Sequence, residues 1–170
     1  MDKASTFAEL LEKDLKKLQN NIARYAIQEI ADDLANETEN AIEIFYSQYD
    51  PEDLSLHNGH IYYYRHWNFR KSFKRYYENH NPRYIGGVEL LPDSIPNVYR
   101  GRSSSPMEVF GRVYYLGWHG IASGQGKVPI MSPSPMQIIM RKYDDIKENS
   151  EKYFNNAVQK ALKDTYNIIS

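Results

Sequence analysis

The side chains that could do chemistry are few, and their spacing suits no known reaction centre. Five histidines are the first candidates for metal binding: His57, His60, His66, His80 and His119. His57 and His60 bracket Asn58-Gly59, a turn signal, so they are not expected to share a helical face. No acidic residue follows them at the spacing of a metal site. We therefore predict turn histidines in contact with solvent, and no metal site.

Nucleophilic catalysis is equally poorly supported. Ser103, Ser104, Ser105 and Ser123 lack the strand–turn–helix context of a Gly-x-Ser-x-Gly motif. The glycine-rich residues 117–126 do not match a phosphate-binding loop, because Lys127 is not followed by Ser or Thr. The chain has no cysteine, which excludes thiol catalysis, disulfides and cysteine-ligated zinc. We expect no catalytic residue and no cofactor, so the protein is not predicted to be an enzyme.

The most distinctive local feature is the segment of residues 65–77. It contains five basic residues interspersed with five aromatic residues, and it has no acidic residue. Single-stranded nucleic-acid sites combine such stacking faces with phosphate partners. This interpretation makes five cations the candidate nucleic-acid contacts: Arg65, Arg70, Lys71, Lys74 and Arg75. The alternative is a half-buried segment with aromatic residues in the core and basic residues at the rim. The net charge of -1 favours that alternative, because it does not suit a generally cationic binder.

Charge is unevenly distributed along the chain. Residues 1–50 hold 5 basic and 11 acidic side chains, whereas residues 57–85 hold 6 basic side chains and one acidic one. The acidic end and the basic middle are expected to attract each other, either within one fold or between neighbouring subunits. The acidic cluster Asp32, Asp33, Glu37 and Glu39 is interpreted as the wet face of a helix, like Asp144-Asp145 near the other end.

These residues must be positioned by a small number of elements. Apolar residues at helical period predict a helix over residues 6–49, which Pro51 ends and which Gln19-Asn20-Asn21 could interrupt. Residues 58–116 are predicted to be a β-sheet region, with strands at 60–65, 84–91 and 109–116 and a stretch at 67–77 that fits either a strand or a short helix. Residues 134–166 are predicted to be helical, starting with Ser134 as a cap and Pro135 in the first turn, with a kink at Asn149-Ser150.

The predicted fold class is α+β. An antiparallel sheet of three to four strands packs against a long N-terminal and a long C-terminal helix, and residues 1–170 make a single domain. The expected core joins residues from both helices and the sheet: Ile22, Ile30, Leu34, Ile42, Phe45, Ile61, Val113, Ile139, Phe154 and Val158. No apolar run approaches the roughly 20 residues needed to span a bilayer, so no membrane association is expected.

The least regular stretch is the long loop at 117–133. Residues 117–135 contain four glycines and three prolines, which exclude regular structure through them. Apolar residues in such a loop favour docking onto a partner. We predict an assembly interface at Trp118, His119, Ile121, Lys127 and Val128. In the alternative arrangement, Trp118 and Ile130 cap the sheet within the monomer.

The order of these parts resembles the minor neck and tail-completion proteins of tailed bacteriophages. That family has a long N-terminal helix, a motif Thr-Gly-x-Leu-Arg-x-Ser-Ile, an antiparallel sheet, a Gly-containing loop, a Pro-Phe-x-x-Pro motif and a final helix. Residues 67–73 resemble the first motif: they keep Arg70 and Ser72 and have apolar residues, Phe69 and Phe73, at its two apolar positions, while His66-Trp67 replaces Thr-Gly. Residues 114–120 resemble the strand end and loop, and residues 129–133 resemble the proline motif.

The resemblance implies a structural virion protein that joins the head connector to the tail. It implies a homo-oligomer in a ring or at its rim, assembled in the host cytoplasm. Its partners would be other neck proteins: the head-side connector, and the tail tube or tail terminator. DNA would only pass through the assembly. The other hypothesis is a nucleic-acid-binding accessory protein that uses residues 65–77.

Overall fold

The computed structural model describes residues 3–48, 56–57, 60–61, 68–80, 83–91, 94, 114–115, 119–120, 130–131 and 134–166. Helix α1 spans Lys3–Gln48, which confirms the predicted N-terminal helix. It runs without interruption through Gln19-Asn20-Asn21, so the break predicted there is wrong. Asparagine inside a helix costs only a fraction of a kcal/mol relative to alanine, too little to end an otherwise favourable helix.

The chain forms two compact units. Unit 1 consists of residues 1–33, 75–87 and 145–170, and unit 2 of residues 34–74 and 88–144. Each unit contains a stretch of α1 and a part of the strands β3 and β4.

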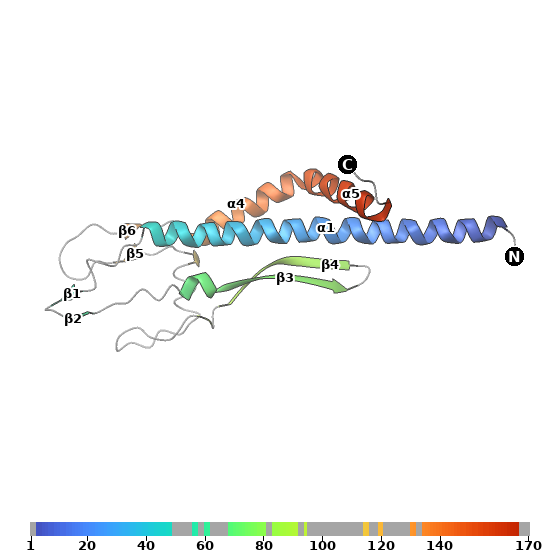
Figure 1. Ribbon diagram of the computed structural model, residues 1–170. Coiled ribbons are helices and arrows are strands. Elements are labelled where there is room, and N and C mark those ends of the chain that lie inside the picture. The colour runs from blue at the N-terminus through green and yellow to red at the C-terminus, as the bar shows by residue number, and fades with distance from the viewer. Residues whose placement is uncertain are drawn as a thin grey trace. The chain divides into compact units, whose positions relative to one another are not determined.

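The longest strands follow a short 3-10 helix, η1, at Asn68–Lys71. Strand β3 spans Phe73–His80 and pairs with β4, Arg83–Leu90. Because only two residues separate them, β3 and β4 form a hairpin (Figure 1). The ambiguous stretch 67–77 is thus a helical turn followed by a strand where it is described.

Two shorter antiparallel pairs complete the described strands. Strand β1 (Leu56–His57) pairs with β2 (His60–Ile61), and β5 (His119–Gly120) pairs with β6 (Ile130–Met131). The α+β class is confirmed, but a sheet of three to four strands is not, because the described strands form separate two-stranded pairs.

The prediction of a third strand over residues 109–116 is wrong at the two residues of this range that the structure describes. Tyr114 and Tyr115 form part of a π-helical turn. The Tyr114 side chain is fully buried, and its carbonyl accepts a hydrogen bond from Ser134 Oγ at 2.5 Å. A serine hydroxyl, rather than a neighbouring strand, therefore donates to the Tyr114 carbonyl.

The C-terminal helical region is broken as predicted. Helix α4 spans Pro135–Glu148 and α5 spans Ser150–Tyr166. At the break, Asn149 Nδ2 donates to the Asp145 carbonyl at 3.0 Å and to Asp145 Oδ1 at 2.9 Å. The asparagine side chain thereby competes with the helical backbone pattern. At the start of α4, the Gln137 N–H lies 3.4 Å from Ser134 Oγ, a weak version of the predicted cap.

Unit 2 has an aromatic core. Ile42, Phe45 and Tyr114 are buried together, and four partly buried residues pack against them: Phe69, Phe73, Leu90 and Ile139. The Phe69 ring lies 5.7 Å from the Phe45 ring and 5.9 Å from the Tyr114 ring, between centroids. The predicted packing of Ile42 and Phe45 with Ile139 is confirmed. The side chains of Ile61 and Val113 lie outside the described residues.

Unit 1 is built around small residues. Its part of α1 lies between α5 on one side and the end of the β3–β4 hairpin on the other (Figure 1). A methyl group built on Gly86 would lie only 2.7 Å from Ile27 Cγ2, so the hairpin backbone touches the helix directly. On α5 the buried stripe is Tyr153, Ala157 and Ala161.

Phe154 was predicted to lie in the core. Its side chain is 54% exposed, so that prediction is wrong. It follows Tyr153, so it is rotated about 100° around α5, away from the buried stripe. The N-terminal apolar stripe is also exposed, at Phe7, Leu10, Leu11 and Leu15.

Candidate functional site

The basic and aromatic segment, residues 65–77, is the first candidate for a functional site. Its Arg70 side chain is paired with a carboxylate of the same chain. Arg70 Nε donates to Glu43 Oε1 at 2.6 Å, and Arg70 Nη2 donates to Glu43 Oε2 at 2.7 Å. This two-pronged pair links η1 to α1 inside unit 2. A planar guanidinium matches a carboxylate in this way, which fixes orientation as well as charge.

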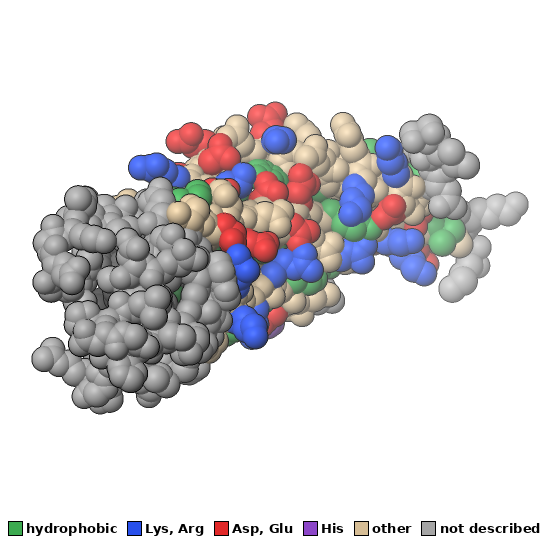
Figure 2. Space-filling model, turned by 60° about the vertical axis from the view of Figure 1, so that its left-hand side comes forward, with side chains coloured by type: hydrophobic (Ala, Val, Ile, Leu, Met, Phe, Trp, Pro, Cys, Tyr) green, Lys and Arg blue, Asp and Glu red, His purple; other side chains and the backbone are tan. Residues whose placement is uncertain are grey.

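Two more cations of the segment, Lys74 and Arg75, also meet carboxylates. Lys74 Nζ lies 2.8 Å from Glu89 Oε2 across the hairpin, and Arg75 pairs with Asp32 of α1. Lys71 is exposed, and Arg65 lies outside the described residues. On the face shown in Figure 2, acidic and basic side chains of the described residues are interspersed. The acidic helix and the basic middle thus attract each other within the chain, one of the two expected arrangements.

The described aromatic residues of the segment face inward or pack on neighbouring residues; Trp67 lies outside the described residues. Phe69 and Phe73 belong to the unit 2 core. In unit 1, the Tyr77 and Tyr84 rings stack with centroids 6.0 Å apart, and burial raises the pKa of Tyr77. The Tyr76 ring lies beside Gly87. The described part of the segment, residues 68–77, therefore resembles the core-and-rim alternative more than an open stacking platform.

A buried hydroxyl network lies beside Arg70, and the sequence analysis did not find it. Ser72 is fully buried, and its Oγ donates to the Phe69 carbonyl at 2.6 Å. The Ser72 and Tyr114 hydroxyl oxygens are 2.6 Å apart. Burial raises the pKa of Tyr114 to about 12, which the hydrogen bond with Ser72 only partly offsets. The network joins residues 42 positions apart, so local patterns could not indicate it.

A polar seam, defined here as Tyr25, Glu29, Asp33 and their partners, joins α1 to α5 within unit 1. Tyr153 OH donates to Asp33 Oδ2 at 2.7 Å, and Asn156 Nδ2 donates to Glu29 Oε1 at 2.7 Å. Tyr25 OH donates to Asp164, and the Lys160 ammonium lies 4.4 Å from the centre of the Tyr25 ring.

The seam changes the interpretation of the acidic cluster. Asp33 contacts α5 and Asp32 contacts β3, so describing both as part of a wet helix face is wrong. Adjacent helical residues point about 100° apart, which is why neighbouring aspartates reach different elements. Burial, together with the hydrogen bond to Asp33, raises the pKa of Tyr153. The hydrogen bond to Asp164 raises the pKa of Tyr25.

The arrangement described so far is one of packing and charge pairing. No family model, curated protein or solved structure matches this chain. The geometry alone must therefore support any functional assignment.

The predicted assembly loop is described only at its two ends. His119 lies opposite Met131, and Gly120 lies opposite Ile130, in the antiparallel pair β5–β6. This pairing brings the beginning and the end of the loop side by side. The other predicted interface residues, Trp118, Ile121, Lys127 and Val128, lie outside the described residues.

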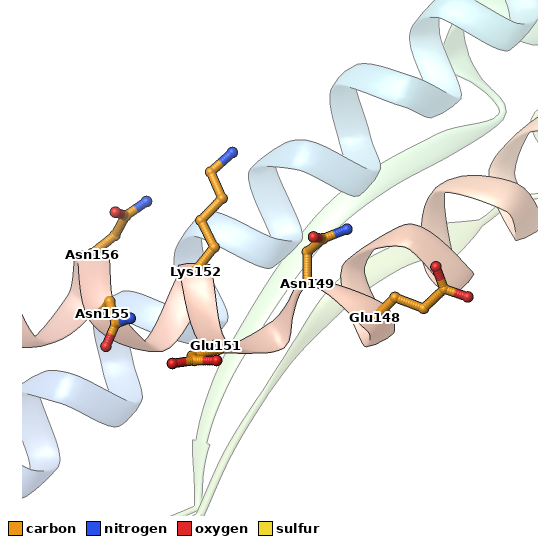
Figure 3. Close-up of a pocket in the computed structure, with 6 residues that line it drawn as sticks. All are labelled: Glu148, Asn149, Glu151, Lys152, Asn155 and Asn156. Atoms are coloured by element: carbon orange, nitrogen blue, oxygen red, sulfur yellow. The ribbon is translucent and has the colours of Figure 1, made fainter.

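Other candidate sites are weak. His57 and His60 lie opposite each other in the β1–β2 pair. Within the described part of the chain, no three or more His, Asp and Glu residues cluster as they would around a metal ion. A shallow polar hollow at the α4–α5 break is lined by Glu148, Asn149, Glu151, Lys152, Asn155 and Asn156. Their side chains splay in different directions (Figure 3). None of the described helices is both long and apolar enough to cross a membrane.

Proposed function

We propose that this chain is a structural virion protein of a tailed bacteriophage, a neck or tail-completion component that joins the head connector to the tail. The observation that carries the proposal is the role of Arg70 and Ser72, the two polar positions shared with the family motif. Arg70 clamps η1 to α1 through Glu43, and Ser72 joins η1 to Tyr114 in the core. A motif that organises the fold suits a structural protein.

In this proposal the subunits form a ring or decorate its rim, and the protein resides in the virion after assembly in the host cytoplasm. It has no catalytic role. The three- to four-stranded sheet expected for the family would require pairing beyond the described strands. The loop at 117–133 supplies the main contact with a neighbouring neck protein. The β5–β6 pair supports this role, because it gives the loop a defined base.

A phage carrying a stop codon in this gene tests the function. We expect filled heads and separate tails in electron micrographs, and restored virions when the protein is supplied from a plasmid. Complete infectious particles without the protein would contradict the proposal.

A plasmid copy carrying Trp118→Ala and Ile121→Ser then tests the loop. This double variant should melt like the parent protein yet fail to restore the joining of heads to tails. The control is Met140→Ser, which changes an exposed apolar residue of α4 and should restore joining.

The nucleic-acid hypothesis is separated by a binding measurement. Single-stranded DNA affinity is measured at several salt concentrations for the parent and for Lys71→Ala. Affinity that rises steeply as salt falls, and that weakens in the variant, would favour the alternative function. Three of its five candidate cations already pair with carboxylates, so we expect weak binding that the variant leaves unchanged.

A further inference from the structure

The beginning of α1 carries an apolar stripe that nothing in the described structure covers. Phe7 is 68% exposed and Leu10 is 58% exposed, and about half of Leu11 and Leu15 is accessible. In Figure 1 this end of α1 extends past both α5 and the hairpin end of unit 1. Singly exposed apolar residues are common on protein surfaces, but four along one helical stripe are typical of an interaction surface.

This part of the helix has little support of its own. The ion pair of Glu12 with Lys16, at 2.6 Å, is fully exposed, and it lowers the pKa of Glu12. A pair of this kind stabilises a helix only slightly, and an isolated helix of about 15 residues is marginal in water. A partner covering the stripe would therefore stabilise the helix as well as bury apolar surface.

The spacing of the stripe indicates what kind of partner fits. Leu11 and Leu15 of the stripe, together with Ala8 before them and Leu18 after them, alternate in steps of three and four residues, the spacing of a seam between two helices. The seam is short, so it suits a single pair of helix ends rather than a long coiled coil.

Charge order indicates which helix that is. Residues 9–17 hold three acids and three lysines, with Glu9 and Glu12 towards the start and Lys16 and Lys17 towards the end. A second copy running in the opposite direction would place the acidic half of one helix opposite the basic half of the other. An anionic membrane surface is a poorer match, because this segment has no excess of basic residues.

We propose that the stripe formed by Phe7, Leu10, Leu11 and Leu15 binds the same stripe of a second copy of this chain, as an antiparallel helix pair. The contact is self-complementary, so it closes into a two-fold dimer and does not by itself extend into a ring. It rests on the exposed helix alone and stands independently of the proposed phage function.

Sedimentation equilibrium of the full chain tests the proposal. The parent should dimerise in a concentration-dependent manner. Leu11→Ser with Leu15→Ser should raise the dimer dissociation constant roughly tenfold or more, because two central contacts are lost. Its melting temperature as a monomer should stay near that of the parent. The matched control is Met140→Ser, since Met140 and Leu15 are both 48% exposed; it should dimerise like the parent.

Two variants test the orientation. In an antiparallel pair centred near residue 13, the two Ala8 positions lie about 15 Å apart along the axis. Because the chain has no cysteine, Ala8→Cys introduces a unique thiol, and oxidation should give little dimer disulfide. Glu9→Lys should weaken the dimer at low salt and less at high salt, because position 9 lies opposite Lys17 of the second copy in such a pair.

Several results would overturn the proposal. A monomeric parent, or a dimer that tolerates the Leu11 and Leu15 substitutions, would show that the stripe is not the self-association surface. Rapid disulfide formation by Ala8→Cys would show a parallel pair. A monomer that sediments with phosphatidylserine vesicles through Leu11 and Leu15 would assign the stripe to a membrane surface.

Discussion

In unit 2, α1 presents Ile42 and Phe45 to an aromatic cluster, whereas in unit 1 it presents Tyr25, Glu29 and Asp33 to α5. The first contact is made by apolar side chains and does not depend on a particular orientation. The second depends on hydroxyl, amide and carboxylate groups that must stay correctly protonated and oriented. One continuous helix thus uses two kinds of packing in succession.

The hairpin repeats this contrast. In unit 2, Phe73 and Leu90 pack on the core with large side chains. In unit 1, Gly86 brings the hairpin backbone against Ile27 and Ala31 without any side chain between them. Large side chains make unit 2 sensitive to truncation, whereas the close approach in unit 1 makes it sensitive to enlargement. The four predictions below test this difference.

The largest effect is expected from truncating the aromatic core. Phe45→Ala should lower the free energy of unfolding by about 3–5 kcal/mol, because it removes a buried ring and leaves a cavity. Phe154→Ala is the matched control, since Phe154 is exposed in unit 1, and it should change the same quantity by about 0.5 kcal/mol or less. Urea denaturation measures both. Equal losses for the two variants would mean that the phenylalanines are buried alike.

The second prediction concerns enlargement in unit 1. Gly86→Ala should lower the free energy of unfolding by about 1–3 kcal/mol, because the new methyl group would overlap Ile27 Cγ2. At Gly87 an added methyl group would meet Tyr76 at 3.6 Å, an ordinary contact. Gly87→Ala should therefore be neutral or stabilising by about 0.4–1 kcal/mol, since alanine restricts the unfolded chain. The reverse order in thermal melts would disprove the close approach.

Local patterns were enough to predict the helices. The N-terminal helix and the break at Asn149 followed from apolar period, proline positions and a helix-breaking Asn-Ser pair. Local patterns could not predict which neighbouring element covers the apolar face of each helix. Phe154 was the wrong choice on α5 because adjacent residues lie on different faces, and the small residues Ala157 and Ala161 mark the true contact.

Non-local contacts were beyond reach. Ser72 and Tyr114 meet although their segments are distant in sequence, and the Tyr114 carbonyl accepts its hydrogen bond from Ser134 Oγ, 20 positions away. The sequence did identify residues 65–77 as unusual, and in the structure Arg70, Lys74 and Arg75 pair with carboxylates while Phe69 and Phe73 pack on the unit 2 core. The period of residues 7–18 predicted an apolar face, but a period cannot say whether the covering partner belongs to the same chain.

The third prediction uses pH to distinguish the buried tyrosine. The pKa of Tyr114 is raised from 10.0 to about 12 in the folded protein. Between these two values the unfolded chain loses the proton and the folded chain keeps it, so stability falls as pH rises. The slope contributed by one such group approaches about 1.4 kcal/mol per pH unit. The contribution is fully present below about pH 10.

Tyr114→Phe should therefore flatten the alkaline loss of stability in urea titrations between pH 10 and pH 12. At neutral pH it should cost about 0.5–1.5 kcal/mol, since Ser72 keeps its hydrogen bond to the Phe69 carbonyl. Tyr25→Phe provides the comparison in unit 1, where the phenol lies at a more exposed position and should matter less. An unchanged alkaline slope in Tyr114→Phe would show that this phenol ionises freely in the folded state.

The smallest effects are expected at the two arginine pairs. Arg70–Glu43 in unit 2 and Arg75–Asp32 in unit 1 are both about half exposed, so each should contribute only about 0.2–1 kcal/mol. Glu43→Gln should cost more than Asp32→Asn, because Arg70 makes two parallel hydrogen bonds to its carboxylate. The difference should shrink in 1 M salt, where surface charges are screened over roughly 3 Å. Arg70→Lys keeps the charge but not the planar fork, and should lose about as much stability as Glu43→Gln. If Arg70→Lys instead behaves like the parent in urea titrations, charge alone holds η1 to α1, and the fork geometry contributes nothing measurable.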